Sequence, residues 1–160
     1  LAGSFYEVSL SNSNPILHPS RLYTMWKDWQ PGIVYPHNPQ FYAEWTLEAS
    51  TLLLQMDDEF QSLLKILGLK EGCIPPILDY YESSDADSLT LKLRSIKAFQ
   101  NISSPMKAVE GGFIPDFSSR YFTEDFPYGM RFIVETAQKH HVSIPTTENI
   151  YQWGLSKIGE

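Results

Sequence analysis

The stretch from Phe41 to Leu67 constrains the fold of this 160-residue chain more than any other. Apolar residues recur in it at steps of three or four, the spacing that places side chains on one face of an α-helix. These residues are Trp45, Ala49, Leu52, Met56, Phe60, Leu63 and Leu67. Such a helix would extend about 40 Å at roughly 1.5 Å per residue, and Gly68 stands where a helix end favours glycine. We therefore predict one long central helix.

Shorter patterns predict further helices along the chain. We expect them at about 20–29, at 74–81, from a cap at 84–87 to about 100, at 126–140 and at 143–157. Residues 1–14 are expected to be extended. Proline and glycine predict loops at 30–40 and 101–117, and Gly111-Gly112 would let the second loop move over a cleft. No stretch alternates over a strand length, so the predicted fold is one all-α domain of about six helices over residues 1–160.

Composition excludes several classes of function. The formal net charge is −7 and the pI about 5.0, so we expect no nucleic-acid partner. No apolar run reaches the roughly 18–20 residues that span a bilayer, and no signal-peptide pattern is present. The single cysteine, Cys73, excludes an internal disulfide. Its isolation indicates a reducing compartment, so we expect a cytoplasmic protein in which Cys73 is structural.

Residues 118–129 concentrate chemistry in one short run that opens a helix. The N–H groups at a helix N-terminus are unpaired and attract anions. Arg120 adds a planar set of donors that suits two-point contact with a carboxylate or phosphate. Asp125 can either cap the helix or orient a histidine from elsewhere in the chain. The sequence leaves both roles open.

The four histidines occupy different settings. His18 lies between two prolines that restrict the backbone, so we expect it in a stiff turn before the helix at 20–29. A lone histidine is more often a buried residue bonded to a carbonyl than a catalytic one. His37 is expected to be exposed, without a partner. His140 and His141 are expected to end a helix rather than bind a metal, because neighbours on a helix point about 100° apart; we therefore predict no metal site.

Three segments, at residues 14–19, 41–44 and 120–129, together resemble the C-terminal domain of the opine dehydrogenases, the octopine/nopaline dehydrogenase family. The most specific is the Arg-x-x-Thr-Glu-Asp-x-Pro-Tyr-Gly run that begins at Arg120. The resemblance extends from about residue 10 to the end of the chain. No Gly-x-Gly-x-x-Gly fingerprint follows a strand anywhere in the sequence.

The resemblance implies roles for individual residues. His18 falls on the catalytic histidine of the family, Asp125 on its acidic partner, and Arg120 on the arginine that holds a substrate carboxylate. Glu124 is an alternative partner for His18 and otherwise a candidate for substrate binding.

Two further positions, Asn14 and Tyr128, are candidates for lining the substrate site. The region from 71 to 116, where the amino-acid side chain could be recognised, carries no matching motif.

The resemblance also implies the reaction. In this family an N-terminal Rossmann domain binds NADH or NADPH, and the helical domain binds an amino acid and an α-keto acid, whose imine is reduced to a secondary amine. The Rossmann domain is absent from this chain, so we expect an incomplete oxidoreductase that is inactive alone and has that domain as its partner. The resemblance leaves open which amino acid, keto acid and cofactor are used, and whether a homodimer forms.

Two other interpretations compete with this one. The chain could be the helical domain of another two-domain hydroxyacid-type dehydrogenase, which needs no amine co-substrate. It could also be a non-enzymatic helical dimerisation module that uses its aromatic residues as a contact face. In that last case His18, Arg120 and Asp125 would lie far apart.

Overall fold

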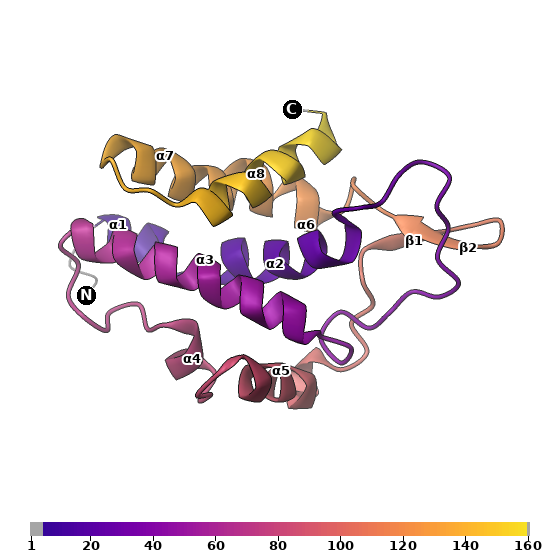
Figure 1. Cartoon of the computed structure of the whole chain (residues 1–160), viewed down its shortest axis with the longest axis horizontal. Coiled ribbons are helices and arrows are strands. Elements are labelled where there is room, and N and C mark those ends of the chain that lie inside the picture. The colour runs from indigo at the N-terminus through magenta and orange to yellow at the C-terminus, as the bar shows by residue number, and fades with distance from the viewer. Residues whose placement is uncertain (1–4, 160) are drawn as a thin grey trace.

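The computed structural model describes residues 5–159, which fold into layers of helices with one small hairpin (Figure 1). Within this range there are six α-helices of five residues or more and two single-turn helices, α4 and α6. The helices are α1 (Phe5–Ser9), α2 (Asn14–Trp26), α3 (Leu47–Ile66), α4 (Ile77–Tyr80), α5 (Ala86–Ser95), α6 (Arg120–Thr123), α7 (Arg131–Lys139) and α8 (Pro145–Ile158). A 3-10 turn spans Lys97–Phe99, and a π-helix spans Asp125–Met130. The mostly helical class predicted from the sequence is confirmed.

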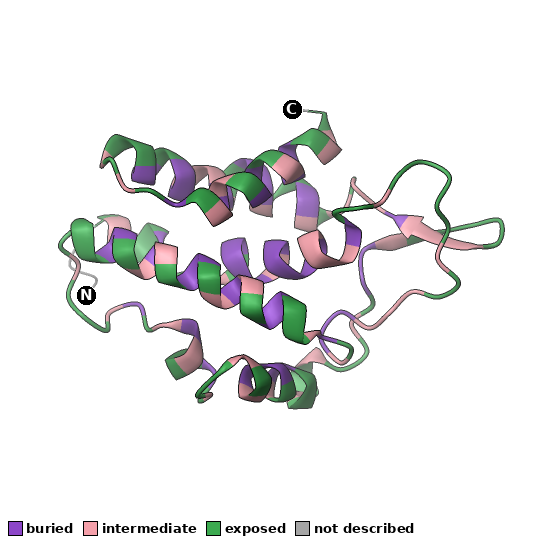
Figure 2. Cartoon of the chain, viewed as in Figure 1, coloured by how far each residue is buried: buried purple, intermediate pink, exposed green. Residues whose placement is uncertain are grey.

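Helix α2 lies at the centre of the molecule. It contacts α3, α8 and the π-helix, while α5 packs on the other side of α3 (Figure 1). Its side chains are the most completely enclosed, as the purple ribbon of α2 shows (Figure 2). Leu22 and Trp26, for example, are almost inaccessible to solvent. The core is therefore built around α2, with the longer α3 as one of its walls.

The predicted long helix exists but begins later than expected. Helix α3 starts at Leu47 because Thr46, in extended conformation, caps it by accepting a hydrogen bond from the N–H of Ala49 at 3.2 Å. Residues 41–46 form a turn instead. The aromatic residues of that turn, including Phe41 and Trp45, are fully buried against α2 and α3.

The stiff turn predicted around His18 is wrong, because His18 lies inside α2. Helix α2 begins at Asn14 and contains Pro19. Pro15 sits in the first turn, where proline is tolerated because its missing N–H has no helical partner. Burial of the apolar face outweighs the cost of Pro19, since tertiary packing supplies most of a helix's stability.

Two of the three segments predicted to lack helix or strand, residues 1–14 and 101–117, do contain such elements. Residues 5–9 of the expected extended segment form α1, and its first four residues lie outside the described range. The expected loop at 101–117 contains an antiparallel hairpin of β1 (Met106–Val109) and β2 (Gly112–Pro115). Gly112 has φ +148°, and a Cβ there would collide with the carbonyl of Tyr35. The glycine thus allows Tyr35 to pair with Phe113 through two backbone hydrogen bonds of 2.8 and 2.9 Å.

Two close contacts fix the π-helix Asp125–Met130 between its neighbours. A Cβ on Gly129 would lie 2.5 Å from Cγ of Pro15 in α2, and one on Gly154 in α8 would overlap the ring of Phe126. Only glycine at these two positions lets the three elements approach so closely. The single helix predicted at 126–140 is observed as two consecutive elements, this π-helix and α7.

Candidate functional site

His18 is held between two side chains that come from distant parts of the sequence. Its Nδ1 lies 2.8 Å from Oδ2 of Asp125 in the π-helix, and its Nε2 lies 2.9 Å from the hydroxyl of Tyr42 in the 41–46 turn. The side chains of His18 and Asp125 are only 14% and 16% exposed. Because a carboxylate only accepts hydrogen bonds, Nδ1 carries a proton and donates it to Asp125. This contact fixes the tautomer and the orientation of the imidazole.

The two roles that the sequence left open for Asp125 are now distinguished. No side-chain cap is formed at the start of α6, of the π-helix or of α7, and Asp125 bonds to His18 instead. Glu124 points to Arg120, with 2.7 Å between Oε1 and Nε and 3.0 Å between Oε2 and Nη2. The paired charges raise the pKa of Arg120 and lower that of Glu124. The neighbouring carboxylates thus have different partners.

Arg120 and the His18–Asp125 pair share one cleft of about 290 Å³. Asn14, Tyr121 and Glu124 complete its lining. The side chain of Arg120 is 86% exposed at the rim. An arginine, a histidine and two carboxylates thus converge on a single pocket wall, as the catalytic interpretation requires and the dimerisation module does not.

A second cleft, of about 420 Å³, borders His18 on the side of Tyr42. Asn14 also lines this cleft, together with Phe99 and Tyr81. Burial raises the pKa of Tyr81 to about 12. His18 is therefore accessible from two cavities, which differ in charge: Arg120 and two carboxylates line only the smaller one.

Tyr128 lines neither of these clefts, contrary to the expectation from the sequence. Its side chain is among the most exposed large ones described, at 73%. The reason is the wider turn of the π-helix, which directs Asp125, Phe126 and Met130 inward and leaves Tyr128 outside.

Tyr42 is the site residue that sequence reasoning did not single out. The signal for it in the sequence is the aromatic opening of the predicted long helix, at residues 41–45. Burial raises the pKa of the Tyr42 phenol well above its usual range, with smaller effects from Tyr121, Tyr81 and Asp125. Tyr121 packs edge-on to His18 with 4.8 Å between ring centres, and burial followed by the charge of Asp125 raises its pKa.

Two arginines hold the turn that carries Tyr42. Arg21 of α2 is buried and donates to the carbonyls of Phe41 at 3.2 Å and Glu44 at 2.9 Å. Arg94 of α5 donates to the carbonyl of Trp45 at 2.7 Å. Burial lowers the pKa of Arg21 to about 10, against the opposing effect of Glu44. The position of Tyr42 relative to His18 thus depends on backbone carbonyls that these arginines bind.

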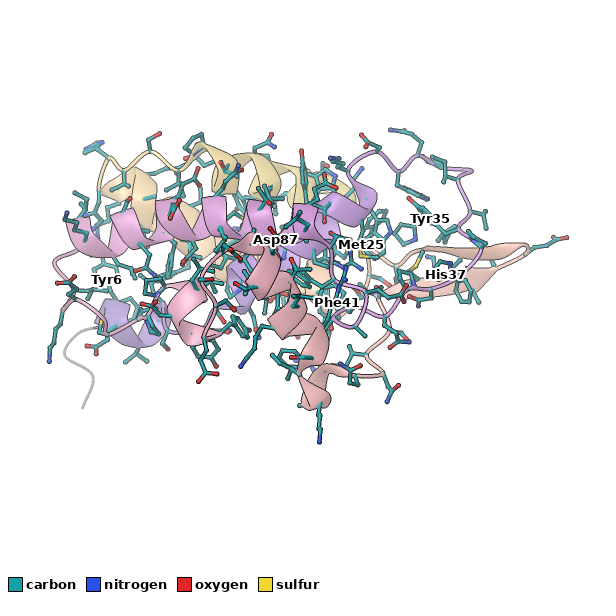
Figure 3. All side chains as sticks on the ribbon, turned by 60° about the horizontal axis from the view of Figure 1, so that its bottom comes forward. Tyr6, Met25, Tyr35, His37, Phe41 and Asp87 are labelled. Carbon is teal, nitrogen blue, oxygen red and sulfur yellow. The ribbon has the colours of Figure 1, made fainter. Side chains whose placement is uncertain are left out.

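The other histidines lie elsewhere. His37 is exposed beside the hairpin, near Tyr35 and Met25 (Figure 3), and its Nε2 lies 3.8 Å from Oε1 of Glu44, a neighbour that the sequence did not suggest. His140 ends α7. Across residues 5–159, no group of three or more His, Cys, Asp or Glu side chains is arranged to hold a metal ion.

The described part of the chain forms neither a membrane-spanning helix nor a Rossmann-type dinucleotide site. None of its helices combines the length and hydrophobicity required to cross a bilayer. The only sheet within it is the two-stranded hairpin, so residues 5–159 contain no parallel βαβ unit of the kind that cradles a dinucleotide. The residues present do not fit NADH or NADPH in that way.

The sequence and fold match known dehydrogenases over the whole chain. Residues 1–157 match the family described as NAD/NADP octopine/nopaline dehydrogenase, alpha-helical domain. Octopine dehydrogenase of Pecten maximus is 30% identical over 171 aligned residues, which cover 100% of this chain and 42% of the relative. Tauropine dehydrogenase of Arabella iricolor is 27% identical over 171 aligned residues, which cover 99% of this chain and 43% of that relative.

Solved structures give the same result. Octopine dehydrogenase in complex with NADH and L-arginine superposes with a TM-score of 0.83 at 30% identity, covering 99% of this chain and 42% of that one. The structure with NADH and pyruvate also has a TM-score of 0.83, covering 100% of this chain and 40% of that one. Fold and site thus define the helical domain of a dehydrogenase. The chain belongs to the octopine/nopaline dehydrogenase family and spans about two fifths of the length of these relatives.

Proposed function

We propose that this chain is the substrate-binding and catalytic part of an NAD(P)H-dependent opine dehydrogenase. The enzyme would condense the amine of an amino acid with an α-keto acid and reduce the resulting imine to a secondary amine. The single observation that carries the proposal is the His18–Asp125 pair at 2.8 Å beside Arg120 in one cleft. Membership of the family supports it, since the relatives include octopine and tauropine dehydrogenases.

His18 is the proposed general acid–base. Imine formation and reduction move protons to and from oxygen and nitrogen near neutral pH, the range in which imidazole exchanges protons. Asp125 orients the ring and would stabilise the imidazolium, as in other histidine–carboxylate pairs. Both side chains keep some exposure and line the smaller cleft, and His18 also lines the larger one, so a substrate in either cleft can reach His18.

Arg120 is the proposed binding residue for the substrate carboxylate. Glu124 engages its Nε and Nη2 and so fixes the plane of the guanidinium, while donors on Nη1 and the second proton of Nη2 extend beyond that ion pair. Asn14, at the start of α2, lines both clefts and is proposed to bind substrate there. The pyruvate and L-arginine complexes of octopine dehydrogenase support an α-keto acid and an amino acid as ligands.

The hydride for the reduction would come from NADH or NADPH. We propose that a Rossmann domain outside these 160 residues binds it, because no dinucleotide cradle of that type exists in the described part of this chain. The helical domain alone would then be inactive. We place the enzyme in the cytoplasm, since the chain has a single cysteine and such cofactor chemistry belongs to a reducing compartment.

Steady-state kinetics of the full-length protein that contains this chain test the proposal. We expect oxidation of NADH or NADPH that requires both an α-keto acid and an amino acid. His18→Ala should lower kcat at least about 100-fold, the usual contribution of a general acid–base. His37→Ala, which removes an exposed histidine, should change kcat less than about twofold. Arg120→Lys should raise the KM for the keto acid but not that for the amine, since lysine lacks the planar two-point contact.

Either of two outcomes would contradict the proposal. One is turnover without any amine, which would favour a hydroxyacid dehydrogenase. The other is equal activity of the His18→Ala and His37→Ala proteins.

A further inference from the structure

The Nε2 atom of His18 has a hydrogen-bond partner of its own, the hydroxyl of Tyr42 at 2.9 Å. Since Nδ1 donates its proton to Asp125, neutral His18 has its lone pair on Nε2, and Tyr42 must be the donor in this hydrogen bond. When His18 is protonated, Nε2–H donates and the Tyr42 oxygen accepts. The same contact therefore accommodates both protonation states of the imidazole, with the phenolic proton reversing its direction.

The ring of Tyr42 is locked in place. It is 4% exposed and packs between Trp45, at 5.8 Å and 7° between ring planes, and Phe99, at 4.2 Å and 23°. The turn that carries it is bound by Arg21 and Arg94. Swinging Tyr42 aside would break this stack, so its hydroxyl stays bonded to Nε2 of His18.

Tyr42 and His18 both line that larger cleft of about 420 Å³. The phenol is therefore bonded to the imidazole and also exposed to the cleft where a substrate would bind. Burial keeps the phenol protonated at neutral pH by raising its pKa, so it can serve as a proton donor. A hydroxyl can donate and accept at once, which is what a relay between two groups requires.

We propose that Tyr42 is a catalytic residue that relays a proton between Nε2 of His18 and the oxygen of a keto acid that Arg120 holds in the smaller cleft and that extends past Asn14 and His18, which line both clefts, to the Tyr42 hydroxyl. This rests on the opine dehydrogenase function proposed above. In the dehydration step, the Tyr42 O–H bond breaks as its proton passes to the hydroxyl of the carbinolamine. The carbon–oxygen bond breaks, water leaves, and the nitrogen lone pair forms the C=N bond of the iminium ion. The Nε2–H proton passes to the Tyr42 oxygen at the same time. The substrate gains one proton, His18 becomes neutral, and Tyr42 ends as it began.

The relay is tested by Tyr42→Phe in the full-length protein, with Tyr35→Phe as the matched control. Tyr35 bonds to the hairpin through its backbone, so loss of its hydroxyl leaves that pairing intact. We expect Tyr42→Phe to lower kcat about 10- to 100-fold, within the range of general acid–base effects. The KM values of both substrates should change less than about threefold, because the stacked ring remains. Tyr35→Phe should match the wild type.

A second readout uses the same full-length proteins and needs no turnover. In ¹⁵N spectra of the His18 ring, the wild type should show a protonated Nδ1 and a hydrogen-bonded Nε2. Tyr42→Phe should move the Nε2 signal downfield, toward the value of an unbonded imine-type nitrogen. An unchanged ring spectrum, or an active wild type in which Tyr42→Phe retains kcat within about twofold, would overturn the relay. A wild-type protein that lacks opine activity despite the expected ring spectrum would refute the proposed function, and the relay with it.

Discussion

At the scale of single residues, the site depends on which of two adjacent carboxylates faces His18. Asp125 lies 2.8 Å from Nδ1, whereas Glu124 forms the ion pair with Arg120. One position along the chain changes the direction of the side chain by about 100° in a helical backbone. The sequence places both carboxylates next to each other, and only the backbone geometry assigns their partners.

This assignment predicts different effects for two isosteric substitutions. Asp125→Asn should lower kcat of the full-length protein about 100-fold or more, because an amide can donate to Nδ1 and so favour the wrong tautomer. Glu124→Gln should leave the tautomer of His18 unchanged and act chiefly through Arg120, on the KM for the keto acid. Steady-state kinetics and ¹⁵N spectra of the His18 ring measure both effects. A larger effect of Glu124→Gln on the ring spectrum would show that the partners are assigned wrongly.

At the scale of elements, the π-helix Asp125–Met130 connects the site to the core. Its wider turn brings Asp125 to α2 and Phe126 to α8 within one short segment. Gly129 against Pro15 and Gly154 against Phe126 are the contacts that permit this approach. The position of the Asp125 carboxylate therefore depends on Gly129 and Gly154, which have no Cβ atom.

Gly129→Ala tests this dependence. The added Cβ would lie 2.5 Å from Cγ and 2.9 Å from Cβ of Pro15, so the π-helix must move away from α2. We expect a loss of about 1–3 kcal/mol in the free energy of unfolding, as is typical of overpacked sites. Urea unfolding followed by circular dichroism measures it.

The matched control for this substitution is its combination with Pro15→Ala, which removes Cγ. The double variant should recover part of the lost stability, because the two side chains contact each other directly. A loss in the double variant equal to the sum of the losses in the two single variants would contradict the contact.

At the scale of the whole molecule, the chain joins its layers with buried polar contacts as well as apolar packing. Glu59 of α3 accepts hydrogen bonds from the backbone N–H groups of Thr146 and Thr147, at 2.7 and 2.9 Å, and from the Thr147 hydroxyl at 2.7 Å. Its carboxylate thus satisfies the N-terminus of α8 from another helix. This links the C-terminal helix to the wall formed by α3.

Glu59→Gln should therefore destabilise the fold. We expect a loss of about 1–3 kcal/mol in the free energy of unfolding, since hydrogen bonds to a charged group are among the stronger ones. Glu48→Gln on the same helix is the control, because Glu48 is 58% exposed and pairs only with Lys27 at the surface. Solvent screens that exposed pair, so its loss should change stability far less than the loss of the Glu59 contacts. Equal unfolding midpoints in urea for the two variants would refute the role of Glu59.

The sequence by itself determined the helical class, the apolar face of α3 and the family. Those features are encoded locally, in residue periodicity and in the contiguous run from Arg120 to Gly129. It also identified His18, Arg120 and Asp125 as one group. The turn predicted at His18 was wrong and the hairpin was not predicted, because burial and pairing with distant residues outweigh local propensity. The later start of α3 has a local cause, the cap that Thr46 forms on Ala49.

Only the tertiary structure decided what surrounds His18. Tyr42 reaches Nε2 because Arg21 and Arg94 bind carbonyls of its turn from two other helices. Asp125 reaches Nδ1 because the π-helix packs on α2 and α8. These contacts join residues up to 107 positions apart, and no local pattern specifies such pairings; they follow from the packing of the complete core.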